Sequence, residues 1–286
     1  MTGRRRTRTW LAALAIACVA ATAQASLTAG AASADPRVSG GSAASTKDYP
    51  WMVYVGRFPG DGNVGTCGGT LVAPNKVVTA AHCVLVDGQQ AAADTMRVIV
   101  GTDSVFNSIV SVVSGQPDSS VVGVSSVWSH PDADVAKHLG DVAVLTLSKK
   151  LTGRATLPLA TTDDSSLYAD GADATLLGWG RTTDTAGAHP SFTQLMGATM
   201  HVVDTSTCAT PWGMSDELQQ QVVCAGGSTN GDNTDACHGD SGGPLVGGGK
   251  LIGLVSFGDD CPQMRAPGVY ANVAYFHDAL TEQIGS

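Results

Sequence analysis

Short runs of apolar and β-branched residues, separated by Gly, Pro, Asp and Ser, recur along most of this chain. Runs of about four to eight such residues between turn-forming residues are typical of strands. Their close succession predicts an antiparallel sandwich or barrel rather than βαβ units. The runs are KVVTA, MRVIVG, SVVGVSSVW, DVAVLTLS, ATLLGWG, KLIGLVSFG and GVYANV.

The choice of charged residues supports a β-rich fold. Of 25 acidic residues, 23 are Asp and only Glu217 and Glu282 are Glu, and the chain has six Lys. Glu and Lys favour helices, whereas Asp and Gly favour turns. A length of 286 residues allows one large or two ordinary domains.

One helix is predicted, over residues 273–284 at the end of the chain. Asn272 can cap this helix. Elsewhere in the chain, residues 147–164 are the candidate linker between its two halves. Four apolar residues recur on one face of the predicted helix: Val273, Phe276, Leu280 and Ile284.

Residues 1–34 predict a secretory signal peptide, with cleavage after Ala25 or Ala34. A basic stretch is followed by the apolar run WLAALAIACVAATA and by small residues. A lipoprotein anchor at Cys18 fits less well because Ala15 stands where a larger aliphatic residue is usual, and twin-arginine export lacks an apolar residue close behind the arginines. We therefore expect a secreted, extracellular protein with no membrane-spanning segment.

Net charge and cysteine content further limit the class of protein to which the chain can belong. Loss of the first 37 residues would change the net charge from −9 to −13, and a nucleic-acid-binding protein normally has a basic footprint instead. Six cysteines remain after Cys18, which reads as three disulfides with 15 open connectivities in a secreted chain. No pair of cysteines or histidines has the spacing of a zinc site, so no metal is expected.

A possible nucleophile lies in the stretch DACHGDSGGP, where Ser241 follows Asp240. Serine needs a base and an orienting carboxylate to act as a nucleophile. His82, in VVTAAHCV, and Asp141, at the head of DVAVLTLS, are the candidates for these roles.

The form GxSxG also fits the nucleophile elbow of an α/β-hydrolase. Those enzymes order their residues as Ser, acid, His on a parallel sheet. Only 45 residues follow Ser241 here, and His277 is the one histidine among them. The order of the residues and the lack of alternating strands and helices exclude this class.

Three blocks in the order His, Asp, Ser carry a resemblance: TAAHC, DVAVL and GDSGGP. With VSGG, CGGTLV, GWG, VSFG and PGVY they span residues 38 to about 284. The chain resembles the trypsin and chymotrypsin family of serine proteases. This resemblance implies an all-β fold of two packed antiparallel six-stranded barrels, with the active site between them and a C-terminal α-helix.

The resemblance implies the following domain bounds. A propeptide over 35–37, longer if the signal is cut after Ala25, precedes a peptidase domain over 38–286. Its N-terminal barrel would occupy about 38–152 and its C-terminal barrel about 153–272.

The resemblance also implies a mechanism. Ser241 attacks the peptide carbonyl, His82 accepts its proton, and Asp141 orients His82. The backbone N–H groups of Gly239 and Ser241 form the oxyanion hole. Ser256 matches the serine that supports the catalytic aspartate in relatives.

A specificity pocket follows from the same comparison. Asp235 matches the acid at the floor of the pocket in trypsin-like members, and Gly258 and Gly268 match its walls. A buried carboxylate in a slot selects Arg or Lys. Ala236 stands where digestive trypsins carry Ser, which predicts a preference for Arg over Lys.

Comparison with the family covers three further positions and the disulfides. Phe257 takes the place of a common Trp and forms an apolar wall, His238 lies on the rim, and Asp260 replaces a Gly near the pocket mouth. The implied disulfides are Cys67–Cys83, Cys208–Cys224 and Cys237–Cys261.

Activation is expected to require cleavage after Arg37. The new N-terminus, Val38, would then fold inward and pair with Asp240, so the chain would be made as a zymogen. Ser39 replaces the usual aliphatic second residue at this site.

The alternative is a catalytically silent homologue that acts as a binding module, although all three active-site residues are in place. Expected partners are protein or peptide substrates and protein protease inhibitors, with no nucleic acid and no membrane. We expect a monomer without a cofactor. The loop after Gly101 offers no readable pair of glutamates for calcium.

Overall fold

The computed structural model of the chain describes residues 41–181, 192–226, 234–259 and 266–285. All of these belong to one structural unit, Ala34–Ser286, and the other unit, Met1–Ser33, lies outside the described residues. The predicted signal peptide therefore stays a prediction. In the described ranges, no helix has the length and apolar character needed to span a bilayer.

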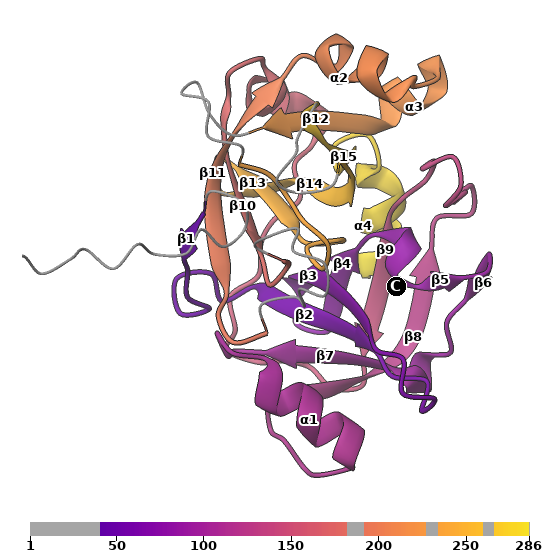
Figure 1. Ribbon diagram of the computed structural model, residues 1–286, viewed down its shortest axis with the longest axis vertical. Helices are drawn as coiled ribbons and strands as arrows, with labels where there is room; N and C mark the ends of the chain where they lie inside the picture. Colours follow the sequence, from indigo (N-terminus) through magenta and orange to yellow (C-terminus); the bar gives the residue numbers. More distant parts are fainter. Residues whose placement is uncertain (1–40, 182–191, 227–233, 260–265, 286) are drawn as a thin grey trace, which may run out of the picture. The chain divides into compact units, whose positions relative to one another are not determined.

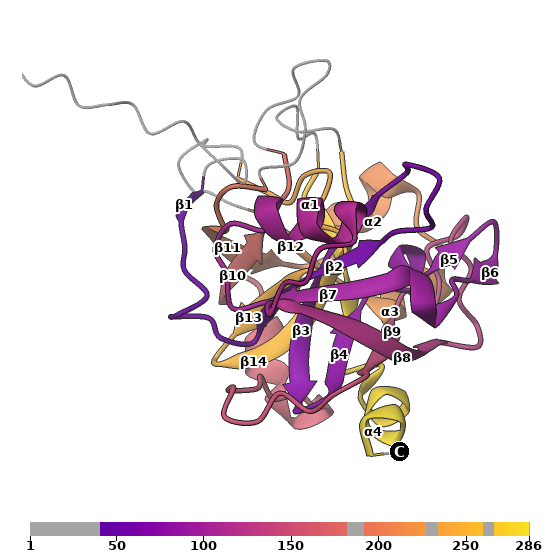
Figure 2. The same ribbon diagram turned by 90° about the horizontal axis from the view of Figure 1, so that it is seen from below.

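Six antiparallel strands from the first half of the chain close into a barrel (Figure 1). Figure 2 shows β7 and β8 crossing β3 and β4, as expected when a twisted sheet closes on itself. Apolar side chains fill the interior, and β4 is buried along its whole length. In order around the barrel the strands are β2 (Met52–Arg57), β3 (Gly65–Ala73), β4 (Lys76–Thr79), β9 (Ala143–Leu147), β8 (Val121–Ser129) and β7 (Met96–Val100).

Six strands from the second half form a second closed, antiparallel barrel, because β11 pairs with β12 as well as with β10. Along β11 buried and more accessible residues alternate, the period-2 pattern of a sheet with one inner face. The prediction of two six-stranded antiparallel barrels is confirmed. In order the strands are β11 (Met196–Val203), β10 (Asp173–Gly178), β13 (Pro244–Gly247), β14 (Lys250–Phe257), β15 (Gly268–Asn272) and β12 (Val222–Gly226).

The start of the described chain belongs to the second barrel. Strand β1 (Ser42–Ala43) pairs with β11 rather than with a strand of the first barrel. The chain then enters the first barrel at β2 and returns to the second barrel at β10. Pairing between β1 and β11 therefore joins segments separated by about 150 residues.

Short helices and turns connect the strands. Helices α2 and α3 begin at capping residues, since Asp204 accepts from Ser206 N–H at 2.8 Å and Ser215 accepts from Leu218 N–H at 3.2 Å. None of the helices α1 to α3 is predicted from the sequence, because they are short and α1 is rich in Ser and Val. The connecting elements are α1 (Phe106–Ser114), α2 (Thr205–Trp212), α3 (Asp216–Gln221), the 3₁₀ turns η1 (Ala81–Cys83), η2 (Ala93–Thr95) and η3 (Thr162–Tyr168), and the β5 (Leu85–Val86) to β6 (Gln89–Gln90) hairpin.

The C-terminal helix α4 covers His277–Gly285. It begins later than the predicted residue 273, because residues 273–276 form a turn in which Asn272 Oδ1 accepts from Ala274 N–H at 3.0 Å. The buried Lys76, the first residue of β4, donates from Nζ to the carbonyl of Gln283 at 2.7 Å. The last turn of the helix is thus hydrogen-bonded to a strand of the first barrel.

The largest apolar core extends beyond the first barrel. It includes Leu71 and Leu145 from that barrel, Leu254 from β14 and Leu280 from α4. The Cys208–Cys224 disulfide lies in a separate apolar cluster beneath α2 and α3. The first barrel, α4 and part of the second barrel therefore bury one continuous apolar surface.

Leu71→Ala is expected to lower the free energy of unfolding by about 2–5 kcal/mol, because Leu71 is fully buried and truncation leaves a cavity. Urea denaturation measures this change in the free energy of unfolding. Both proteins carry Ser241→Ala to prevent self-digestion. Val113→Ala, at a valine with 68% exposure, is the control and should change stability by less than about 0.5 kcal/mol. Equal effects of the two substitutions would contradict the described core.

Candidate active site

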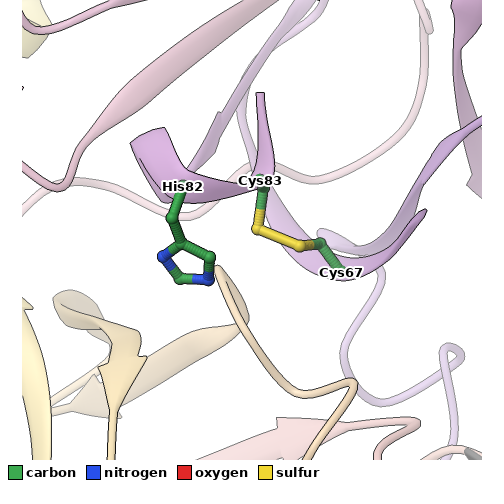
Figure 3. Close-up of side chains that lie close together, drawn as sticks. All are labelled: Cys67, His82 and Cys83. Atoms are coloured by element: carbon green, nitrogen blue, oxygen red, sulfur yellow. A yellow bond between two sulfur atoms is a disulfide. The ribbon is translucent and has the colours of Figure 1, made fainter. Parts of the chain in front are cut away.

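His82 is held by a buried strand on one side and by a disulfide on the other. Strand β4 leads directly into η1, which carries His82. The next residue, Cys83, is bonded to Cys67 on β3 with a Cα–Cα distance of 6.2 Å. Figure 3 shows the imidazole beside this bridge. The backbone that carries His82 is therefore anchored from both directions.

Cys67, His82 and Cys83 lie as close together as the ligands of a metal site. Within the described part of the chain, potential ligand atoms of Cys67, His82 and Cys83 lie within 4.8 Å of one another. Both sulfurs are engaged in the disulfide (Figure 3), so neither is a thiolate. Because the thiolate is the form of cysteine that binds metals, this cluster positions His82 and offers no metal site while it is oxidised.

The carboxylate of Asp141 binds both the backbone and the side chain of His82. The carboxylate accepts from His82 N–H at 2.9 Å and from His82 Nδ1 at 2.9 and 3.1 Å. Ser256 Oγ, on β14, donates to the same carboxylate at 2.5 Å. With Nδ1 as the donor, Nε2 of the neutral imidazole is left as an acceptor.

The charges of the pair stabilise one another. Burial favours the neutral form of each group, but the charge of Asp141 and its hydrogen bond outweigh burial and raise the pKa of His82. Burial likewise opposes ionisation of Asp141, yet the charge of His82 and the hydrogen bonds from His82 and Ser256 lower its pKa. Asp141 is therefore ionised at neutral pH and His82 has increased basicity.

Ser241 lies in a tight turn before β13. The flanking residues Gly239 and Gly242 have φ of +102° and +70°, values that L side chains rarely adopt. The carbonyl of Ser241 accepts from Gly68 N–H on β3 at 2.8 Å. This bond joins the turn of the second barrel to the first barrel, and His82 and Ser241 line the same two cavities.

The carboxylate of Asp240 lies fully buried behind this turn. It accepts from Gly180 N–H at 2.7 Å and from Cys237 N–H at 2.9 Å. Burial outweighs these hydrogen bonds and raises the pKa of Asp240 to about 6. An added Cβ would meet Asp240 Oδ1 at 1.9 Å from Gly178 and Asp240 Cγ at 2.4 Å from Gly180, so only glycine fits at either position.

Another buried carboxylate, Asp235, lines a cavity of about 330 Å³. It accepts from Tyr270 Oη at 3.0 Å and from Ala236 N–H at 2.7 Å. Burial is the main cause that raises its pKa to about 7. An added Cβ at Gly268 would come within 2.3 Å of Asp235 Oδ1, so a side chain there would cover the carboxylate.

The cavity that contains Asp235 opens between the barrels. His82 and Ser241 lie on its wall together with Asp235, which combines a base, a hydroxyl and a carboxylate on one surface. His82 comes from the first barrel, whereas Ser241 and Asp235 come from the second.

Comparison with known proteins decides the family. The family model described as Trypsin matches residues 38–280. The chain belongs to the trypsin family. It is similar to a trypsin of Saccharopolyspora erythraea, with 40% identity over 86% of this chain and 98% of that protein. It is also similar to trypsin alpha of Drosophila melanogaster (35% identity, 84% of each chain) and trypsin delta of Drosophila erecta (33% identity, 84% of this chain and 85% of that protein).

As a member of the trypsin family, the chain is a serine endopeptidase. The implied disulfides Cys67–Cys83 and Cys208–Cys224 are confirmed. Most of the predicted pocket residues lie around the one cavity that also contains Asp235: Ala236, His238, Ser256, Phe257, Gly258 and Gly268.

Other predicted residues fall outside the described part of the trypsin-family domain. These are Arg37 and Val38 at the expected activation site, Asp260 near the pocket mouth, and Cys261 of the third disulfide. Their roles stay predictions.

His138 and Tyr270 are among the residues of the cavity that were not identified from sequence. His138, with φ of +58°, stacks on Phe257 with ring centroids 4.0 Å apart and lines the cavity. Burial lowers its pKa. Tyr270 donates to Asp235 from β15. The position of His138, three residues before Asp141, was the available signal, whereas Tyr270 has none beyond its place in the PGVY block.

Gly180→Ala is expected to lower kcat/KM by at least about tenfold and stability by about 1–3 kcal/mol, because the new Cβ overlaps the Asp240 carboxylate and displaces the turn of Ser241. Steady-state kinetics and thermal unfolding measure the two effects. Gly285→Ala, where an added Cβ has open space, is the control. Wild-type kinetics in the Gly180 variant would contradict the described packing.

Proposed function

We propose that this trypsin-family protein is a secreted endopeptidase, made as a zymogen, that cleaves peptide bonds after Arg and less efficiently after Lys. The observation that carries this proposal is the buried Asp235 carboxylate in the cavity lined by His82 and Ser241. A cationic side chain that enters this cavity meets this carboxylate. The bond that follows the cationic residue then lies at Ser241.

In the proposed mechanism, Ser241 Oγ attacks the carbonyl carbon and His82 Nε2 takes the hydroxyl proton. His82 then delivers this proton to the leaving amine, and an acyl-enzyme remains on Ser241. Water hydrolyses the ester by the same route. The hydrogen bonds of Asp141 support its role in holding Nδ1 as the donor and in stabilising the imidazolium.

The backbone N–H groups of Gly239 and Ser241 are the proposed oxyanion hole. The φ of +102° at Gly239 supports this role, since a residue with a Cβ rarely adopts it. Loss of one such donor costs about 2.7–4 kcal/mol of transition-state stabilisation.

Alanine at position 236 favours Arg over Lys. The guanidinium group can bind both oxygens of Asp235 at once, whereas the compact Lys ammonium depends on additional acceptors. Ala236 supplies a backbone N–H to Asp235 and has no hydroxyl to accept a hydrogen bond.

The zymogen proposal rests on Asp240. A fully buried carboxylate with two backbone donors is poorly stabilised as an anion, as its raised pKa of about 6 indicates. The ammonium of Val38, released by cleavage after Arg37, would supply the opposite charge. The turn that carries Gly239 and Ser241 would become ordered for catalysis at that step.

The proposed function includes four further properties. They are export through the signal peptide, a monomeric state, recognition by protein protease inhibitors, and activity without a cofactor.

The pH dependence of kcat/KM should have an acidic limb with its midpoint above about 6.5, the ordinary histidine pKa. The pKa of His82 is raised, so the imidazole is protonated and inactive as a base below that midpoint, and activity falls as pH falls through it. Asp141→Asn should move the midpoint down and lower kcat by at least about 100-fold.

Initial rates between pH 5 and 9 on one Arg substrate measure this limb. Asp163→Asn, at an exposed aspartate of η3, removes the same charge elsewhere and should leave the midpoint in place. An unchanged midpoint in the Asp141 variant would exclude the proposed pairing.

The first experiment on specificity uses protein cleaved after Arg37, with intact mass confirming Val38 as the N-terminus. A peptide panel varies the residue before the scissile bond. We expect cleavage after Arg, slower cleavage after Lys, and none in Ser241→Ala. Asp235→Ser should reduce kcat/KM on Arg peptides by at least about 100-fold, since breaking a buried ion pair costs about 3–5 kcal/mol.

Uncleaved protein tested on the same panel should be nearly inactive. Full activity with Arg37 still joined to Val38 would refute the zymogen proposal. Cleavage after large apolar residues would refute the role of Asp235, and equal rates after Arg and Lys would refute the role of Ala236.

A further inference from the structure

A second cavity, of about 420 Å³, also reaches His82 and Ser241. Its walls are the ends of β2 and β3, the Cys67–Cys83 disulfide and the β5–β6 hairpin with its turn. Asp235 belongs to the first cavity and not to this one. The two cavities therefore meet at His82 and Ser241 and continue on different sides of them.

The charged side chains of this second cavity are Arg57 and Asp87, besides His82 itself. Arg57 is the last residue of β2 and is partly buried. Its stem and Nε lie along Gly65 of β3, where an added Cβ would come within 3.2 Å of Arg57 Cβ and 3.6 Å of Nε. Glycine at position 65 thus leaves room for the arginine to lie against the strand.

The guanidinium of Arg57 is available to a ligand. Among the described residues, its side chain takes part in no hydrogen bond or ion pair, and its interaction with the exposed Asp61 is the weakest of the causes that act on that carboxyl. The chain as a whole has a net charge of −9 and carries 25 acidic residues against 16 basic ones. An unpaired cation beside the reacting groups of such an acidic protein indicates a site for an anion.

The direction of a substrate follows from the proposed function, on which this inference rests. A side chain that binds Asp235 belongs to the residue before the scissile bond. Because His82 has to protonate the leaving amine, the residues after the scissile bond extend past His82, into the cavity that contains Arg57. The two cavities thus receive opposite ends of one peptide.

We propose that Arg57 binds a carboxylate side chain of the substrate within the first two residues after the scissile bond. The enzyme would then recognise a bond with a basic residue before it and Asp or Glu after it. Asp87, in the turn of the β5–β6 hairpin, opposes this preference, but it is exposed and its field is screened by water, whereas Arg57 is partly buried.

The test uses the cleaved, active enzyme and internally quenched peptides in matched pairs. Each pair carries Glu or Gln at one of the two positions after the scissile bond, and the pairs are made with Arg, Lys or Phe before it. The readout is the ratio of kcat/KM for the Glu peptide to that for the Gln peptide, so a general change in activity cancels. In the wild type we expect a ratio of roughly five to ten.

Three substitutions separate the charges. Arg57→Gln should bring the Glu-to-Gln ratio of kcat/KM to about one. Arg57→Glu should bring this ratio below one, and a peptide with Lys in place of Glu after the scissile bond should then be cleaved faster than the Gln peptide. Asp87→Asn should raise the ratio, because it removes the opposing carboxylate. Arg97→Gln removes an arginine from the neighbouring strand β7 and should leave the wild-type ratio in place.

A wild-type ratio near one, or a ratio that persists in both Arg57 variants, would overturn the role of Arg57. Failure of the proposed function has a different signature, since the enzyme would then cut the Phe series and not the Arg series. The Glu-to-Gln ratio within the Phe series would still measure the preference that Arg57 gives for a carboxylate after the scissile bond. A ratio in the wild type that collapses on charge removal and reverses on charge inversion would establish the proposal.

Discussion

The charge of Asp141 is stable inside the protein because both barrels supply hydrogen-bond donors to it. His82 donates from the turn after β4 in the first barrel, and Ser256 donates from β14 in the second. An isolated buried carboxylate would instead take up a proton. Correct packing of the barrels against each other is thus a condition for the ionised state of Asp141, and through it for the basicity of His82.

Three buried carboxylates lie near this interface, and their surroundings give them different properties. Asp141 has a basic partner and a lowered pKa, whereas burial raises the pKa of Asp235 to about 7 and of Asp240 to about 6. A positive charge placed beside either of the latter two would lower its pKa. One molecule thereby combines an aspartate whose ionised form is stabilised with two aspartates whose neutral form is favoured by burial.

Much of the fold was predictable, because strands between turn residues leave a local pattern in sequence. The blocks around His82, Asp141 and Ser241 could likewise be placed, since each combines a reactive side chain with an adjoining strand or turn. Long-range geometry was not predictable. Neither the stacking of His138 on Phe257 nor the contact of Gly180 with Asp240 has a local signal. The first joins the β8–β9 connection of the first barrel to β14 of the second, and the second joins two loops of the second barrel.

Local propensity also explains what was missed among the helices. The segment that forms α1 is rich in Ser and Val, which have modest helix propensity, and its start has no side-chain cap. The end of the chain was predicted as helix, but the first regular residue is His277, because Asn272 caps a turn that comes before it.

The hydrogen bond from Lys76 to Gln283 has a consequence for the order in which the protein folds. Lys76 belongs to an early strand, and its acceptor lies 207 residues later, while Leu280 completes the apolar core of the first barrel. During synthesis, the first barrel emerges long before the helix that covers it. The N-terminal half therefore cannot reach its final packing alone, and folding is completed only when the last residues of the chain have been made.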